Sequence, residues 1–266
     1  MSAHGRVLII AGSDSGGGAG LQADIKTVTM LGGYAATAVT AVTVQNTLGV
    51  TGVHTIPLDI IEAQARAVLS DLGADVIKTG MLGEAAVVEL AARLIAETGL
   101  PAVVDPVMVA KGGARLLDPA AVAALCHALV PLAALLTPNA PEAEALTGLT
   151  VATQDDQRRA GDALLKMGAG AVLMKGGHIP GPRVVDLLIT PQGETTFEGE
   201  RIDTRHTHGT GCTLASACAT GIAQDQSLIM AVGRAWDFVH RAILSAPGLG
   251  SGHGPLDHGW PLRGRA

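Results

Sequence analysis

Short apolar runs alternate along this chain with longer segments whose apolar residues recur at helical spacing. The first run, Val7–Ala11, stops at a glycine-rich stretch, and residues 21–31 after it have the pattern of an amphipathic helix. Further apolar runs predict strands over residues 38–44, 76–79, 102–105, 134–137, 171–175 and 184–189, with an antiparallel edge strand over 195–202. Helical spacing predicts helices over residues 58–72, 84–97, 119–129, 140–146, 155–167, 211–223 and 228–245. This alternation predicts a three-layer α/β/α fold with a mostly parallel central sheet flanked by helices.

Composition narrows the class of protein. The chain has no internal repeat and no linker rich in proline, glycine or serine, so we expect one domain over residues 1–266. The net charge of −6, without a lysine and arginine cluster, argues against a nucleic-acid surface. No apolar run reaches the roughly 18 residues of a membrane span, and residues 1–6 do not resemble a signal peptide. The three cysteines fit neither a disulfide framework nor a CxxC zinc site. We therefore expect a cytoplasmic enzyme that acts away from membranes.

Two polar features follow the first predicted strands. Ligands of such sheets sit outside the carboxyl ends of the strands. Residues 12–20, Gly-Ser-Asp-Ser-Gly-Gly-Gly-Ala-Gly, form a loop whose backbone could approach a flat ligand, although it matches neither a P-loop nor GxGxxG. Gln45 and Asn46 end the next strand, and a primary amide offers an acceptor and a donor side by side, as an aminopyrimidine edge requires. A flexible turn and strand-end amides are the simpler alternatives.

Carboxylates and a lysine follow the later strands. Asp105 ends one strand, and Asn139 and Glu142 stand three residues apart at a predicted helix start. Their oxygens suit Mg²⁺, which proteins commonly share with substrate phosphates. The alternative for Asn139 and Glu142 is a capping box. Lys175 ends an apolar strand and could contact a phosphate, or it could be an ordinary surface lysine.

The segment His206-Thr207-His208-Gly209-Thr210-Gly211-Cys212-Thr213 precedes an apolar helix. The first turn of a helix has N–H groups without intrahelical partners and carries partial positive charge, so it binds anions. Cys212 at this position should have its thiolate favoured. The alternative is a glycine turn before a core helix with one buried cysteine. His206 and His208 could touch phosphate, but filling the turn is the simpler role.

Taken together, these motifs resemble the bacterial hydroxymethylpyrimidine/phosphomethylpyrimidine kinases of thiamine biosynthesis. The resemblance extends from about residue 6 to the Gly252–Pro255 tail and rests on motifs in their family order. These are residues 10–20 (IAGSDSGGGAG), 44–47 (VQNT), 78–82 (KTGML), 104–108 (VDPVM), 137–139 (TPN), 175–178 (KGGH) and 208–212 (HGTGC). The resemblance implies a ribokinase-like fold and two successive ATP-dependent phosphorylations, first of 4-amino-5-hydroxymethyl-2-methylpyrimidine and then of its monophosphate. It also suggests a homodimer.

The resemblance implies a role for each motif at the pyrimidine. Gln45 would read the aminopyrimidine edge, with Asp24, Gly12 and Met81 around the ring. A vitamin B6 kinase is the nearest alternative, because pyridoxal-type substrates are also flat heteroaromatics with a hydroxymethyl group. A regulatory module that binds pyrimidine without chemistry is another.

At the phosphates, the resemblance makes Gly209, Thr210, Gly211 and Cys212 an anion hole, with Cys212 at the position of the catalytic base. Lys175 and Asn139 would contact the ATP phosphates, while Asp105 and Glu142 would organise Mg²⁺. Most ribokinase-like enzymes have aspartate where this chain has Cys212. A thiol with pKa about 8.5 is a modest base, but phosphoryl transfer demands little of its base.

Overall fold

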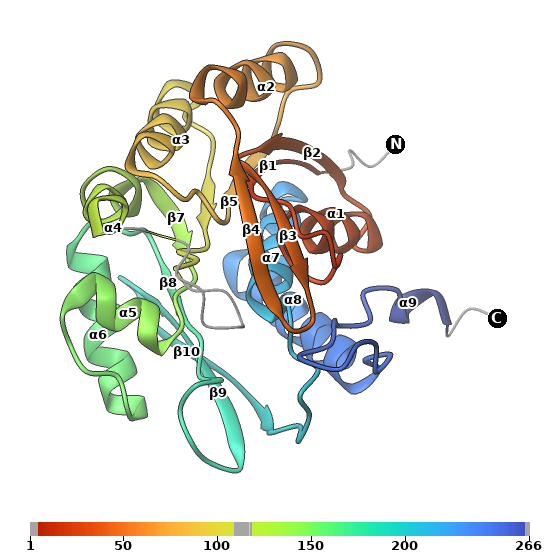
Figure 1. Ribbon diagram of the computed structural model, residues 1–266. Helices are drawn as coiled ribbons and strands as arrows, with labels where there is room; N and C mark the ends of the chain where they lie inside the picture. The colour runs from red at the N-terminus through yellow and green to blue at the C-terminus, as the bar shows by residue number, and fades with distance from the viewer. Residues whose placement is uncertain (1–4, 109–116, 118, 264–266) are drawn as a thin grey trace.

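The computed structural model describes residues 5–108, 117 and 119–263, and it confirms the α/β fold (Figure 1). Its main sheet has eight strands in the order β10-β9-β8-β7-β6-β5-β1-β2. Strands β8, β7, β6, β5, β1 and β2 of this sheet run parallel to one another. Strand β9 is antiparallel to β8, and β10 is antiparallel to β9. The strands are β1 (Arg6–Ala11), β2 (Tyr34–Val39), β3 (Ala41–Asn46), β4 (Gly49–Thr55), β5 (Val76–Thr79), β6 (Ala102–Val104), β7 (Ala133–Leu136), β8 (Val172–Met174), β9 (Arg183–Thr190) and β10 (Gly193–Glu200).

The helices lie close to their predicted positions. They are α1 (Gly20–Met30), α2 (Leu58–Asp71), α3 (Ala85–Thr98), α4 (Pro119–Ala124), α5 (Ala140–Thr147), α6 (Gln154–Lys166), α7 (Thr210–Ala223), α8 (Leu228–Leu244) and α9 (Trp260–Arg263). The helix expected over 119–129 changes geometry after α4, with a π-turn over Leu125–Leu129 followed by a 3₁₀ turn over Val130–Leu132. Among the described helices, none has the length and apolar character needed to cross a membrane.

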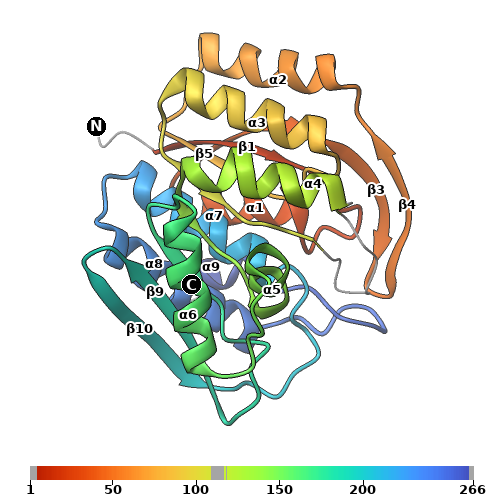
Figure 2. The same ribbon diagram turned by 90° about the vertical axis from the view of Figure 1, so that its left-hand side faces the viewer.

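The period-2 alternation of the central strands separates two cores. On β1, Leu8 and Ile10 pack against the side covered by α2 and α3, whereas Val7 and Ile9 face α1, α7 and α8. Figure 2 shows α2, α3 and α4 one above another on the first side. Because both faces of the sheet are buried, these strands read as continuous apolar runs. Their polar ends are left at one edge, where the ligand side of the fold lies.

The strand expected over residues 38–44 requires a correction. It is broken at Thr40, whose N–H donates to the carbonyl of Ala11 and whose carbonyl accepts from Ile56. Residues before the break form β2 in the main sheet, and those after it form β3, which pairs only with β4 in a separate two-stranded sheet. A continuous segment of strand-forming residues does not reveal where a chain leaves one sheet for another. The break projects the β3–β4 hairpin beside the carboxyl ends of the main strands (Figure 1).

Candidate active site

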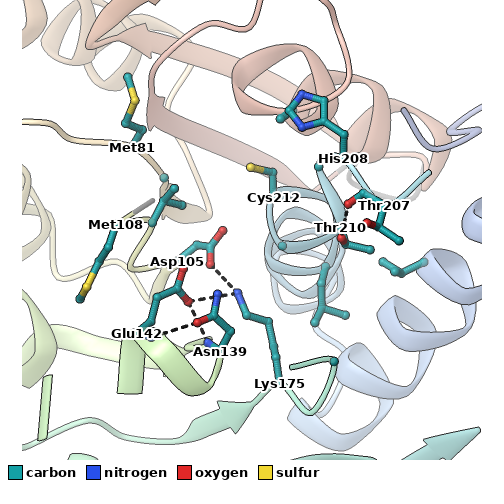
Figure 3. A pocket seen from close by; sticks show the side chains of 18 of the residues that line it. Met81, Asp105, Met108, Asn139, Glu142, Lys175, Thr207, His208, Thr210 and Cys212 are labelled. Carbon is teal, nitrogen blue, oxygen red and sulfur yellow. Dashed lines mark hydrogen bonds and ion pairs between the residues drawn. The ribbon is translucent and has the colours of Figure 1, made fainter. Parts of the chain in front are cut away.

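A large cavity opens at the carboxyl ends of the central strands. Its volume is about 1000 Å³, and its walls include Gly12 after β1, Gly80 after β5, Asp105 after β6, Asn139 after β7 and Lys175 after β8. The end of β3 completes these walls together with the first turn of α7, where Figure 3 shows Thr210 and Cys212. The motifs that are widely separated in the sequence therefore meet in one cavity.

The ammonium group of Lys175 lies between two carboxylates. Its Nζ is 3.0 Å from Asp105 Oδ1 and 3.5 Å from Glu142 Oε2, and all three side chains are largely enclosed (Figure 3). Burial alone would lower the pKa of Lys175, but the charges of Asp105 and Glu142 outweigh it and raise that pKa. Burial raises the pKa of Glu142 to about 7 against the opposing charge of Lys175. The cluster therefore keeps a fixed positive charge beside a carboxyl group that can change its protonation near neutral pH.

Asp105 has one free oxygen. Its Oδ1 accepts hydrogen bonds from Lys175 and from the Thr137 hydroxyl, whereas the buried Oδ2 has no hydrogen-bond partner among the described residues. A buried carboxylate oxygen without a partner suits a cation. Within the described part of the chain, no three His, Cys, Asp or Glu side chains gather at one point to hold a metal. The residues therefore fit Mg²⁺ that takes one or two carboxylates here and its remaining ligands from phosphates and water.

Asn139 and Glu142 form the capping box that was the alternative to their role as ligands. The Glu142 N–H donates to Asn139 Oδ1 over 2.9 Å, and the Asn139 N–H donates to Glu142 Oε2 over 2.8 Å. The capping box and the site occur together, because Glu142 Oε2 is also the oxygen that faces Lys175. The cap fixes the carboxyl group where it can respond to charge in the cavity.

Glycines at the start of α7 allow other parts of the chain to lie close to its backbone. Gly209 has φ of 86°, and a Cβ there would collide with the carbonyl of Gly18. A Cβ at Gly211 would lie 3.2 Å from Lys175 Nζ and 3.6 Å from the free Oδ2 of Asp105. The Thr210 hydroxyl is already engaged, since it donates to the carbonyl of Thr207 over 2.6 Å. In the part of the chain that the structure describes, no side chain caps α7 at Gly209, so its first-turn N–H groups can face an anion beside Lys175.

The expectation of a favoured Cys212 thiolate is wrong. Cys212 lines the cavity, but burial raises the pKa of its thiol to about 12. The charge of Lys78 opposes this shift, while Asp24 and Asp105 add to it. The cost of desolvating a thiolate exceeds the stabilisation available from the helix N-terminus and the lysine. Cys212 is therefore a neutral thiol in the free protein.

At the other wall, Gln45, Gly12 and Met81 line the cavity as expected. Asp24 does not, and its placement around a ring must be corrected. Its side chain is completely buried beneath the cavity wall, where both oxygens accept from Lys78 Nζ at 2.9 and 3.0 Å and Oδ1 also accepts from Ser216. Lys78 itself lines the cavity, and its position as a charge inside an apolar strand was the sequence signal for this pair.

Asp14 and His208 form a buried pair that the sequence reading did not identify. His208 Nε2 is 2.8 Å from Asp14 Oδ2 and 3.3 Å from one end of the Gln45 side-chain amide. Asp14 also accepts backbone N–H bonds from Gly16, Gly18 and Ala19, so it organises the glycine loop. The sequence feature that could have indicated this pair is Asp14 itself, a single carboxylate within a glycine-rich loop. His208 therefore does more than fill the turn.

A second unpredicted group lines the far end of the cavity. Trp236 and His240 on α8 stack with ring centroids 5.1 Å apart and an interplanar angle of 11°. The indole lies so close to β10 that a Cβ at Gly199 would come within 2.6 Å of it. Apolar side chains of Val184, Val239 and Ile243 also line the cavity. Flat aromatic and aliphatic surface of this kind suits a planar heteroaromatic ligand group.

Comparison with known proteins assigns the family. The family model described as phosphomethylpyrimidine kinase matches residues 14–257. The chain belongs to this family. It is 49% identical over 256 residues to a hydroxymethylpyrimidine/phosphomethylpyrimidine kinase of Streptomyces coelicolor, with 96% of this chain and 95% of that protein covered.

The chain is also similar to a longer bifunctional protein and to a solved pyridoxal kinase. The chain is 50% identical over 256 residues to the thiamine biosynthesis bifunctional protein ThiED of Geobacter sulfurreducens, with 96% of this chain covered, and it spans about half (52%) of that longer protein. A solved ADP complex of Bacillus subtilis pyridoxal kinase superposes with a TM-score of 0.91 at 37% identity, covering 98% of this chain and 99% of the other. This member of the phosphomethylpyrimidine kinase family thus has the same fold as a pyridoxal kinase.

Proposed function

We propose that this protein uses ATP to phosphorylate 4-amino-5-hydroxymethyl-2-methylpyrimidine and then phosphorylates the resulting monophosphate to the diphosphate, for thiamine diphosphate biosynthesis. The observation that carries the proposal is the position of Gly211. Gly211 is in the first turn of α7 and faces the Lys175–Asp105 pair, in the same cavity as Gln45. One wall is thus suited to phosphoryl groups and another to an aminopyrimidine edge.

The phosphoryl-transfer end works mainly through position and charge. Lys175 contacts the ATP phosphates, and the first-turn N–H groups of Gly211 and Cys212 receive the transferred group. Asp105 Oδ2, with Glu142, would hold Mg²⁺, and Asn139 places Glu142 and offers its remaining amide N–H groups to phosphate. Mg²⁺, when bound, neutralises charge on the phosphates. The planar wall at Trp236 accommodates the adenine base.

Cys212 acts as the base of the first phosphorylation only as its thiolate, so the thiol must first release its proton to water. With a pKa of about 12, little thiolate is present at neutral pH, so the alcohol cannot be deprotonated in advance. In a largely dissociative transition state, however, the hydroxyl proton is released only after the oxygen has begun to bond to phosphorus. In the second phosphorylation the acceptor is an ionised phosphate that has no proton to lose. Cys212 therefore contributes to the first step more than to the second.

A second candidate function is phosphorylation of a pyridoxal-type alcohol, which the TM-score of 0.91 with a pyridoxal kinase favours. The higher identity to named pyrimidine kinases, 49% against 37%, supports the first candidate. The deciding experiment measures kcat/KM of the recombinant protein on the pyrimidine alcohol and on pyridoxal with MgATP. A higher value for the pyrimidine supports the proposal, and a higher value for pyridoxal contradicts it. Tight pyrimidine binding without turnover of either alcohol would instead indicate a regulatory module.

We propose further that the protein is a homodimer through the outer face of the β3–β4 hairpin. Val42, Val44 and Leu48 on this hairpin are 47%, 62% and 69% exposed, and Val42 and Val44 share the exposed face of β3. Light scattering should give the mass of a dimer for the native chain and of a monomer for Val44→Lys. A native monomer would contradict the dimer.

We also propose that residues 1–266 form one ribokinase-like domain and that the protein is cytoplasmic. The three free cysteines support the cytoplasmic location.

A further inference from the structure

The amide of Gln45 lies between two groups whose hydrogen-bonding roles are fixed elsewhere. His208 Nε2 is 3.3 Å from one end of the amide, and Thr43 Oγ1 is 3.3 Å from the other. These two neighbours determine which end of the amide is oxygen and which is nitrogen, because only one arrangement gives each of them a complementary partner.

His208 must present a donor. Its Nε2 is 2.8 Å from Asp14 Oδ2, and that carboxylate also accepts three backbone N–H groups, from Gly16, Gly18 and Ala19. Burial alone would raise the pKa of Asp14, but the hydrogen bond from His208 and those from the loop backbone outweigh it and hold the pKa below its usual value. An ionised carboxylate can only accept, so Nε2 of His208 carries a hydrogen.

Thr43 must present an acceptor. Its hydroxyl has one hydrogen, which it donates to the carbonyl of Ser13 over 2.8 Å. A carbonyl oxygen can only accept, so the lone pairs of Thr43 Oγ1 remain for Gln45. With the Gln45 nitrogen toward His208 and its oxygen toward Thr43, two donors would face each other at one end and two acceptors at the other.

We infer that Gln45 binds its ligand with Oε1 toward His208 and Nε2 toward Thr43, and that His208 and Thr43 are positioning residues that orient the substrate ring. In this arrangement one N–H of Gln45 donates to Thr43, and one lone pair of its oxygen shares the Nε2–H of His208, whose nearer acceptor is Asp14 Oδ2. The second lone pair and the second N–H remain side by side at the free end of the amide. The 4-amino group of the pyrimidine therefore lies on the His208 side, and the adjacent ring nitrogen lies on the Thr43 side.

This orientation also directs the reacting group. The hydroxymethyl carbon is attached to the ring atom next to the one that bears the amino group. When the amino group faces His208, the hydroxymethyl group is on the side of the neighbouring residues Gly209 to Cys212. The opposite amide orientation would turn the amino group, and the hydroxyl with it, toward Thr43 and away from the start of α7. The inference rests on the proposed function, since it assumes a pyrimidine ligand.

The first test reads the tautomer of His208 in the full, ligand-free protein. A long-range ¹H–¹⁵N spectrum, assigned through the backbone, should show His208 with hydrogen on Nε2. An unprotonated Nε2 would overturn the inference, because Gln45 would then donate to it. This measurement needs no variant and no substrate.

The second test measures ring discrimination by calorimetry, as the Kd ratio between 5-hydroxymethyl-2-methylpyrimidine and the substrate that carries the 4-amino group. His208→Phe should reduce this ratio by roughly three- to tenfold, the effect of one side-chain hydrogen bond. Thr43→Val should reduce it similarly, whereas His206→Gln, in the same loop but outside the cavity wall, should leave it unchanged. Equal weakening of both ligands in His208→Phe would overturn the inference and indicate a role limited to folding the loop. Absence of pyrimidine binding by the native protein would instead overturn the proposed function.

Discussion

The buried pair between Lys78 and Asp24 gives a stability prediction that can be worked from the structure. Both side chains are completely buried, Lys78 bridges both carboxylate oxygens, and Ser216 donates to one of them. The pair links β5 to α1 and α7 beneath the cavity wall. Removal of one partner leaves an uncompensated charge in the interior, which costs about 3–5 kcal/mol.

We therefore expect Lys78→Met and Asp24→Leu each to lower the free energy of unfolding by about 3–5 kcal/mol. In a chain of this length that corresponds to roughly 6–20 °C in Tm. The double variant replaces the ion pair with apolar side chains of similar size, so the remaining loss is about 1–3 kcal/mol for the unsatisfied Ser216 hydroxyl. The double variant should be more stable than either single variant.

Urea and thermal unfolding followed by circular dichroism provide the assay, with equal m-values as the check that the unfolded state is unchanged. Glu62→Gln is the matched control, because it removes a carboxylate from an exposed cluster with Arg66 and Arg93 and should leave the unfolding midpoint unchanged. Losses in the two single variants that simply add in the double variant would refute the reasoning, since independent effects exclude a coupled buried pair.

Three further predictions concern the phosphoryl-transfer end. Cys212→Ala should slow the first phosphorylation by roughly 100-fold and the second by less than about fivefold, measured on each substrate separately; equal losses would exclude Cys212 as the base of the first step. Because burial raises the pKa of Cys212 to about 12, its alkylation by iodoacetamide, followed by peptide mapping, should accelerate roughly tenfold per pH unit from pH 7 to 9; a plateau near pH 8 would show a stabilised thiolate. Asp105→Asn should lower kcat/KM by about 10²–10³-fold while the Kd of the pyrimidine changes by less than about threefold; near-native turnover would remove Asp105 from the site.

The sequence predicted the elements and the edge at which the site lies, because both follow from local patterns. Fully apolar runs such as Val7–Ala11 are typical of strands buried on both faces, and the residue after such a strand faces the ligand side. Asp105 and Lys175 stand at such positions, and Gly211 stands in the first turn of α7, so local patterns were sufficient to place all three at this edge.

What the sequence could not predict depends on contacts between distant segments. The break at Thr40 is set by its hydrogen bonds to Ala11 and Ile56. The burial of Asp24 is set by Lys78, 54 residues away. The protonation of Cys212 depends on how completely other segments enclose it, which a local motif does not encode. In each case the prediction considered only the residues next to it in the sequence, whereas the outcome depends on contacts with distant segments.

The central claim is that one cavity performs two successive phosphoryl transfers on a pyrimidine alcohol. The most direct measurement follows the native protein with MgATP and 4-amino-5-hydroxymethyl-2-methylpyrimidine by ³¹P NMR. We predict that a monophosphate ester signal rises first and is then replaced by the two signals of a diphosphate ester. A reaction that stops at the monophosphate would contradict the second transfer, and a spectrum without any phosphate ester would contradict the account as a whole.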